Sequence, residues 1–177
     1  MTLYLFRHAA VEDKYRGCYN GHIDIPISKE GLKEAKECFK TIEDINFDAI
    51  FCSTLQRAKQ TLKSFSLKKE AVFSDLLREK SWGRHEGKSY DEVVAMEGAS
   101  YENFEQWIKD LDGESYEDFT KKISQFLSQI KLLKADNILL VSHAGVIYTL
   151  IHLIKKCSLE EAFGINISYG DYYELNL

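Results

Sequence analysis

Four short runs of apolar residues recur along the chain, and each is followed by polar residues. The runs are rich in aromatic and branched side chains, which suits strands that are buried on both faces of a sheet. We therefore predict strands at Thr2–Phe6, Phe47–Cys52, Ala71–Phe73 and Asn137–Ser142.

Apolar residues at helical spacing follow these runs. After Ser28 they recur at Leu32, Ala35, Phe39 and Ile42, which places them on one face of a helix. A serine side chain at the start of a helix can accept a hydrogen bond from a free backbone N–H group, and several patterns begin in this way. The further helices are predicted from Ser53 through Phe65, from Ser89 with Glu92 as a capping box, from Ser115 through Ile130, and over Gly145–Lys156.

Strands that alternate with helices are typical of parallel neighbours joined by right-handed crossovers. The sequence therefore predicts an α/β fold, a three-layer α/β/α sandwich with a mostly parallel central sheet. The tail from Ile165 to Leu177 indicates a strand, a Gly-Asp turn and a second strand at a sheet edge. No linker or internal repeat divides the chain, so residues 1–177 are predicted to form a single domain.

The composition is that of a folded protein with one substantial core. Hydrophobic residues make up 45% of the chain and charged residues 29%, with a single Pro. The formal net charge of -5 argues against nucleic acid or an anionic membrane as a partner, because both require a broad basic surface. Four scattered cysteines lack the paired spacing of a zinc site or a disulfide framework, which indicates reduced packing residues.

The apolar segments do not suggest a membrane or secreted protein. The first residues, MTLYLFRH, lack the basic region of a signal peptide. The stretch Ile138–Ile154 carries Ser142, His143 and Thr149, which favours a buried strand and helix over a membrane span. We expect a cytoplasmic protein that is a monomer or a homodimer.

Charged side chains follow each predicted strand, at the edge where open α/β sheets bind ligands. Arg7 and His8 follow the first strand, Arg57 the second, Glu79 the third and His143 the fourth. Each has an ordinary explanation when taken alone, as a surface charge or a core histidine. Their joint placement at one edge favours a functional site.

These residue types suit phosphoryl transfer. A transferring phosphoryl group spreads negative charge over three oxygens, which Arg7, Arg57 and a protonated His143 would surround. His8 would attack through a neutral ring nitrogen while a backbone carbonyl holds the other nitrogen. Glu79 would protonate the leaving group and later deprotonate water. This chemistry needs no metal and no other cofactor, and its substrate is a small phosphomonoester.

Six segments, in order, resemble the motifs of the histidine phosphatase superfamily, in the branch that contains cofactor-dependent phosphoglycerate mutases and many small phosphatases. The segments are LFRHAA, GHIDIPISKEGLKEA, CSTLQRAKQT, LREKSWGRHEG, GES at residues 113–115, and VSHAGVI. The resemblance covers nearly the whole chain and implies a phosphoglycerate mutase-like fold.

The resemblance also implies a role for each residue of the site. His8 is then the phosphorylated nucleophile, and Glu79 is the acid and base. The implied phosphate-binding residues are Arg7, Arg57 and His143, together with Asn20 and the adjacent Gly21.

Several positions depart from the family pattern. Ala9 and Ala10 stand where a glycine and an acidic residue usually follow the Arg-His pair, and Lys14 replaces a common asparagine. The outer pocket is therefore expected to differ from that of a standard mutase. The segment KYRGCYNGHIDIP is most similar to the α-ribazole phosphatase subgroup, which implies α-ribazole 5′-phosphate as a substrate and a role in cobalamin synthesis.

Three other functions are open on this sequence. A phosphoglycerate mutase would shield the phosphohistidine from water, but 34 residues follow His143, fewer than in mutases of the family. A non-catalytic phospho-ligand-binding module would not require the intact set of His8, Glu79 and His143. A metal hydrolase could use these residues with His85, although no H-x-H or H-E-x-x-H spacing supports it.

The other histidines are expected outside the chemistry, with His22 in a loop, His85 in the outer pocket and His152 on a helix face. The loops Ala9–Asn20 and Lys80–Trp107 are expected to determine the substrate.

Overall fold

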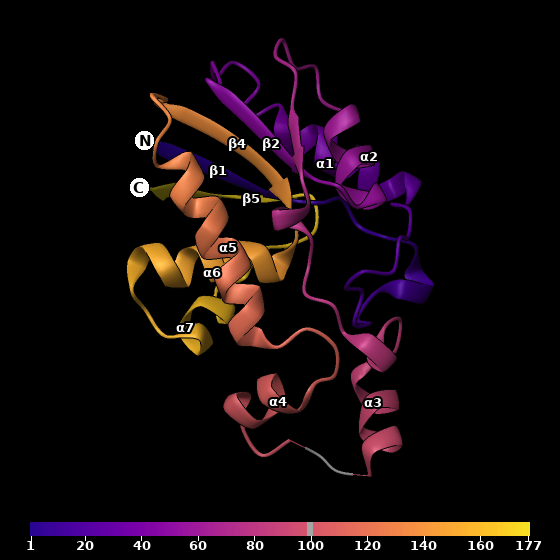
Figure 1. The fold of residues 1–177 in the computed structure, drawn as a ribbon. Coiled ribbons are helices and arrows are strands. Elements are labelled where there is room, and N and C mark those ends of the chain that lie inside the picture. The colour runs from indigo at the N-terminus through magenta and orange to yellow at the C-terminus, as the bar shows by residue number, and fades with distance from the viewer. Residues whose placement is uncertain (99–100) are drawn as a thin grey trace.

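A computed structural model describes residues 1–98 and 101–177 of the chain. These residues form a five-stranded sheet in the order β3-β2-β4-β1-β5, shown in Figure 1. Strand β5 runs antiparallel to β1, and the other neighbours are parallel. The strands are β1 (Thr2–Arg7), β2 (Ala49–Ser53), β3 (Val72–Ser74), β4 (Asn137–Ser142) and β5 (Tyr172–Asn176).

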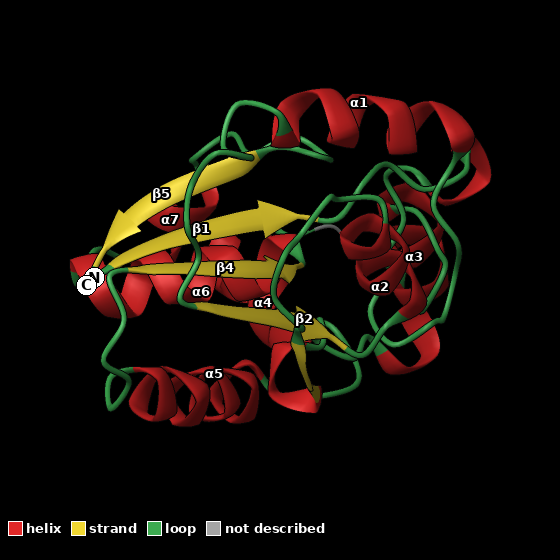
Figure 2. Cartoon of the chain, turned by 90° about the horizontal axis from the view of Figure 1, so that it is seen from above, coloured by secondary structure: helices red, strands yellow, loops and turns green. Residues whose placement is uncertain are grey.

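Helices cover both faces of this sheet, with α1 on one side and α5 on the other in Figure 2. The helices of the described residues are α1 (Lys29–Phe39), α2 (Gln56–Lys63), α3 (Tyr90–Glu97), α4 (Phe104–Asp110), α5 (Tyr116–Ile130), α6 (Ala144–Lys155) and α7 (Leu159–Phe163). The predicted α/β/α fold class is confirmed.

Strand β1 shows why the sheet needs both helical layers. Successive side chains of a strand point to opposite faces. Leu3 and Leu5 pack in the core with residues of α5 and α6, whereas Tyr4 and Phe6 pack in a second core with residues of α1 and α2. The apolar run that predicted a strand buried on both faces is therefore divided between two cores.

Two short helices were not predicted. Helix α4 begins after Asn103, whose side chain accepts from the backbone of Gln106, and α7 begins with a capping box of Ser158 and Glu161. Neither is long enough to display a helical period of apolar residues. Both lie near the functional edge of the sheet, as shown below.

The predicted cap at Ser53 is wrong. Ser53 is the last residue of β2, and α2 begins three residues later with Leu55 as its N-cap. The Ser53 side chain is fully buried and lies 2.7 Å from Nε2 of His143. Its hydroxyl therefore contributes to the site at the strand end.

The first of the two strands predicted in the tail is also wrong. Residues 165–168 form a loop, and the turn at Gly170 leads into β5 alone. The backbone polar groups of this loop are used elsewhere, because the Ile167 carbonyl accepts from Arg7 and the Gly170 N–H group donates to the His8 carbonyl. The tail thus holds Arg7, the last residue of β1, and His8, which follows it.

The segment between β3 and α5 extends beyond the carboxyl ends of the strands and carries α3 and α4 (Figure 1). It forms one side of the region where the predicted site residues lie. In the described ranges, no helix combines the length and the apolar character needed to cross a membrane.

Candidate active site

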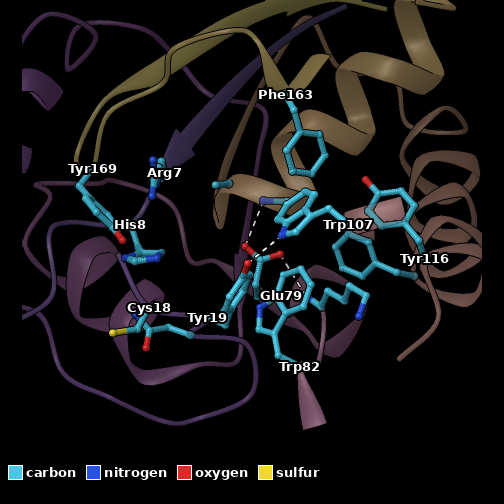
Figure 3. A pocket seen from close by; sticks show the side chains of 15 residues that line it. Arg7, His8, Cys18, Tyr19, Glu79, Trp82, Trp107, Tyr116, Phe163 and Tyr169 are labelled. Carbon is cyan, nitrogen blue, oxygen red and sulfur yellow. Dashed lines mark hydrogen bonds between the residues drawn. The ribbon is translucent and has the colours of Figure 1, made fainter. Parts of the chain in front are cut away.

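A cleft of about 170 Å³ opens at the carboxyl edge of the sheet (Figure 3). Of the predicted site residues, Arg7, His8, Asn20 and Glu79 line it. Arg57 and His143 are fully buried, and the His143 ring centroid lies 5.1 Å from that of His8. The structure thus brings together residues that are distant in sequence.

His8 is held as a neutral imidazole with one nitrogen free. Its Nδ1 lies 2.8 Å from the Ala9 carbonyl, which fixes the proton on Nδ1 and leaves the lone pair on Nε2. The backbone is held too, since the N–H group of His8 donates to Ser142 of β4. Burial, followed by the charges of Arg57 and Arg7, lowers the pKa of His8 well below its usual value. The predicted carbonyl contact is confirmed.

Arg7 is fixed by the tail of the chain. Its Nη1 donates to the Ile167 carbonyl at 2.7 Å, and its guanidinium carbon lies 3.8 Å from the centroid of the Tyr169 ring. The same ring lies 5.4 Å from the centroid of His8. Tyr169 was not predicted as a site residue, because it lies within the segment interpreted as strand and turn.

Arg57 lies on the first turn of α2 and is fully buried. Its Nη1 donates to the Ile23 carbonyl, and its Nη2 donates to those of Asn20 and Gly21, at 2.7 to 2.9 Å. Burial lowers its pKa. The terminal N–H groups therefore hold loop 20–23, and the buried Nε has no partner among the described residues.

Glu86 holds the same loop from its other side. Its carboxylate accepts from the backbone N–H groups of Gly21, His22 and Ile23 at 2.7 to 3.1 Å, and from that of Trp82 at 3.0 Å. A Cβ atom on Gly21 would lie 2.1 Å from the Lys80 carbonyl, which explains the glycine. Glu86 belongs to a quoted motif, but sequence reasoning gave it no role.

His143 forms the N-cap of α6, directly after β4. Its Nε2 contacts the Ser53 hydroxyl, and burial together with the charges of Arg57, His8 and Arg7 lowers its pKa well below the usual value. The free site therefore favours neutral His143, and the protonated form expected around a phosphoryl group stays a prediction. A bound phosphate dianion would favour the charged form again.

Glu79 is buried, with 8% of its surface exposed. Its Oε1 accepts from the backbone of Lys80 and its Oε2 from that of Gly145, both at 3.0 Å. Burial raises its pKa, although these N–H groups and the two arginines oppose the shift. A buried carboxyl group with a raised pKa can carry a proton to a leaving group.

The predicted positions of the other three histidines are confirmed for two and wrong for one. His22 lies in a loop and His152 on α6, as expected. His85 does not line the cleft, because its Nε2 lies 2.8 Å from Glu97 and its Nδ1 accepts from the backbone of Asp112. Within residues 1–98 and 101–177, no group of three or more His, Cys, Asp or Glu side chains is arranged to hold a metal ion.

Both loops that were expected to determine the substrate contribute to the cleft. Loop Ala9–Asn20 contributes Cys18, Tyr19 and Asn20, and loop Lys80–Trp107 contributes Lys80, Trp82 and Trp107. Residues 99 and 100 of the second loop lie outside the described residues.

The chain is similar to known phosphatases and mutases along nearly its whole length. The chain is 29% identical to the adenosylcobalamin/alpha-ribazole phosphatase of Salmonella typhimurium, over 100% of this chain and 91% of that protein. It is 26% identical to a 2,3-bisphosphoglycerate-dependent phosphoglycerate mutase of Allorhizobium ampelinum, over 99% and 90%. The fold matches the alpha-ribazole phosphatase of Shigella flexneri with a TM-score of 0.84 at 24% identity, over 100% and 91%. The model of the histidine phosphatase superfamily (branch 1) matches residues 3–177, and the chain therefore belongs to this family.

Proposed function

We propose that the protein is a phosphomonoesterase that transfers the phosphoryl group of a small phosphorylated metabolite to His8 and then to water. The observation that carries the proposal is the state of His8, a buried neutral imidazole whose Nδ1 is held by Ala9 and whose Nε2 is free in the cleft. Glu79 supplies the acid that lines the same cleft.

The first step forms a bond between His8 Nε2 and phosphorus while the bond to the ester oxygen breaks. Glu79 gives its proton to that oxygen, so the product leaves as an alcohol. In the second step the Glu79 carboxylate takes a proton from water, whose oxygen attacks phosphorus as the N–P bond breaks. Phosphate leaves, and both residues return to their starting states.

Positive charge around the phosphoryl group comes from the protein. Arg7 lines the cleft, and Arg57 and His143 lie near His8. Asn20 binds the phosphate in this scheme, positioned by the hydrogen bond that Arg57 donates to its carbonyl. Gly21 supports loop 20–23 instead, because its N–H group donates to Glu86 and its carbonyl accepts from Arg57. We propose that this set makes catalysis independent of a metal ion.

The proposed substrate is α-ribazole 5′-phosphate, which the name of the Salmonella typhimurium relative supports. The second candidate is a phosphoglycerate mutase-type transferase, which the Allorhizobium ampelinum relative favours. The two differ in what accepts the phosphoryl group from His8, water in one case and a rebound product in the other. We propose that the protein acts in the cytoplasm as a monomer or homodimer.

Trapping the intermediate tests the role of His8. Quenching in alkali during turnover should capture a phosphoryl group that is stable to base and labile to acid, on the peptide that contains His8. Hydrolysis in ¹⁸O-water should place the heavy isotope in the released phosphate, and a bisphosphate primer should not make the enzyme an efficient mutase. A label on His143 or Ser53, or near-normal turnover in His8→Ala, would falsify the assignment.

Chelation tests the source of the positive charge. Hydrolysis of a phosphomonoester should continue at an unchanged rate after prolonged incubation with EDTA, because Arg7, Arg57 and His143 supply the charge in this proposal. Activity that disappears with EDTA and returns with zinc or magnesium would instead assign the chemistry to a metal site.

A further inference from the structure

Aromatic side chains form a continuous wall in the outer part of the cleft, around Glu79. Tyr19 and Trp82 lie on loops, Trp107 on α4, Tyr116 at the start of α5 and Phe163 at the end of α7. The ring centroids of Tyr19 and Trp82 lie 5.3 Å apart, and those of Trp107 and Tyr116 lie 6.1 and 6.3 Å from Phe163. In Figure 3, Glu79 lies between His8 and the part of this wall formed by Trp107 and Tyr116, whereas Tyr19 lies on the His8 side of Glu79.

The polar ends of three of these rings, those of Tyr19, Trp107 and Tyr116, are already paired. The indole N–H group of Trp107 donates to the Tyr19 hydroxyl at 2.7 Å, and the Tyr116 hydroxyl lies 2.6 Å from that of Thr149. A ligand in the outer cleft therefore meets ring faces and edges, which favour apolar and planar groups.

Lys80 carries the ammonium group among the described residues that line the cleft, and this group already has partners within the protein. Its Nζ donates to the carbonyls of Ser81 and Asp112 at 3.1 and 3.2 Å, and lies 4.3 Å from the Trp82 ring centroid. The lining residues that carry the other formal charges are Arg7 and Glu79, which the reaction uses. Among the described residues, the outer cleft thus offers a substrate neither a free cation for a carboxylate nor a free carboxylate for an ammonium group.

We propose that the outer cleft selects an uncharged leaving group that carries a planar apolar ring close to its phosphorylated hydroxyl. A charged leaving group would lose water there without gaining a counter-ion, which is unfavourable, whereas a ring would gain contacts with the wall. This inference rests on the proposed phosphatase function and narrows its substrate class.

Matched phosphates of primary alcohols test the selection without a large change in leaving-group chemistry. We expect kcat/KM for 2-phenylethyl phosphate to exceed that for propyl phosphate by about 10- to 100-fold, the gain from burying one ring. Phosphoethanolamine and 3-phosphonooxypropanoate should fall below propyl phosphate. Equal or better turnover of either charged substrate, relative to the phenylethyl ester, would overturn the inference and leave the phosphatase proposal intact.

Variants of the wall assign the preference to these residues. Phe163→Leu and Trp107→Leu, on two different helices, should each lower the ratio of phenylethyl to propyl turnover by about three- to tenfold. Phe73→Leu, an exposed position on β3 outside the cleft, should leave the ratio unchanged. Two wall variants that fold, as judged by circular dichroism, and keep the wild-type ratio would overturn the inference. Absence of phosphate release from every ester would overturn the proposed function and this inference together.

Discussion

At the scale of single residues, burial shifts the pKa values of the proposed acid, Glu79, and the proposed nucleophile, His8, in opposite directions. Burial raises the pKa of Glu79 and lowers that of His8, because burial disfavours the charged form of each group. Each shift therefore favours the neutral form of its group, the protonated carboxyl and the unprotonated imidazole. This is the pair of protonation states that the first proposed step requires.

Replacing Glu79 by Gln should slow different substrates unequally. An alkyl leaving group needs a proton, so its hydrolysis should slow by about 10²-fold or more. p-Nitrophenyl phosphate should slow much less, since its phenolate leaves without protonation. The measurement is kcat/KM for both substrates in the two proteins. Equal losses would exclude Glu79 as the general acid.

At the scale of elements, loop 20–23 lies between a cation and an anion that do not touch. Arg57 donates to its carbonyls, and Glu86 accepts from its N–H groups. The loop includes Asn20, which lines the cleft, and Gly21. A hydrogen-bonded segment held in this way keeps the site in place before substrate arrives.

Replacing Glu86 by Gln should weaken this loop and the site with it. The amide loses the negative charge and turns an N–H₂ donor toward backbone donors, so we expect a loss of about 2 to 4 kcal/mol in the free energy of unfolding. Urea denaturation measures this loss, and kcat should fall in the same variant. Glu97→Gln is the control, because Glu97 accepts from the side chains of Arg84 and His85 outside the cleft. Comparable losses in the two variants would contradict the special role of Glu86.

At the scale of the whole molecule, folding places two histidines where they resist protonation. His8 and His143 are buried near the two arginines, and their pKa values lie well below those of an unfolded chain. Below about pH 6.5 these two histidines therefore bind more protons in the unfolded chain than in the folded one. The free energy of unfolding decreases as the pH is lowered through this range. Glu79 opposes this in part, since its raised pKa favours the folded state as the pH falls toward about 4.3.

The unfolding temperature should therefore fall as the pH is lowered from 7 to 5. Each histidine contributes up to about 1.4 kcal/mol per pH unit, and each kcal/mol corresponds to about 2 to 4 °C in a domain of this size. His8→Asn keeps a donor for the Ala9 carbonyl and His143→Gln keeps a polar contact to Ser53, while neither can be protonated. The double variant should show a flatter dependence of Tm on pH than the wild type. An unchanged slope would mean that these histidines titrate normally in the folded protein.

The sequence by itself determined which segments form strands and the longer helices, and it placed the charged residues at the strand ends. Both results follow from local rules, whereas the order of the strands in the sheet came from the tertiary structure. Buried strands need continuous apolar runs, and the ends of parallel strands meet at one edge. His8, Glu79 and His143 could therefore be chosen as candidates before their distances were known. Their catalytic roles stay predictions.

Contacts between distant segments were decided by the tertiary structure alone. The pairing of Glu86 with loop 20–23 and the packing of Tyr169 on Arg7 join residues far apart in the chain, and neither leaves a periodic signal in the sequence. The neutral state of His143 has the same origin, since its pKa depends on burial and on arginines from β1 and α2. Part of the aromatic wall likewise forms where α4 and α7 meet. These two helices are too short to show a helical period of apolar residues in the sequence. Local patterns specify elements, whereas burial and long-range contacts set the charge states and the shape of the cleft.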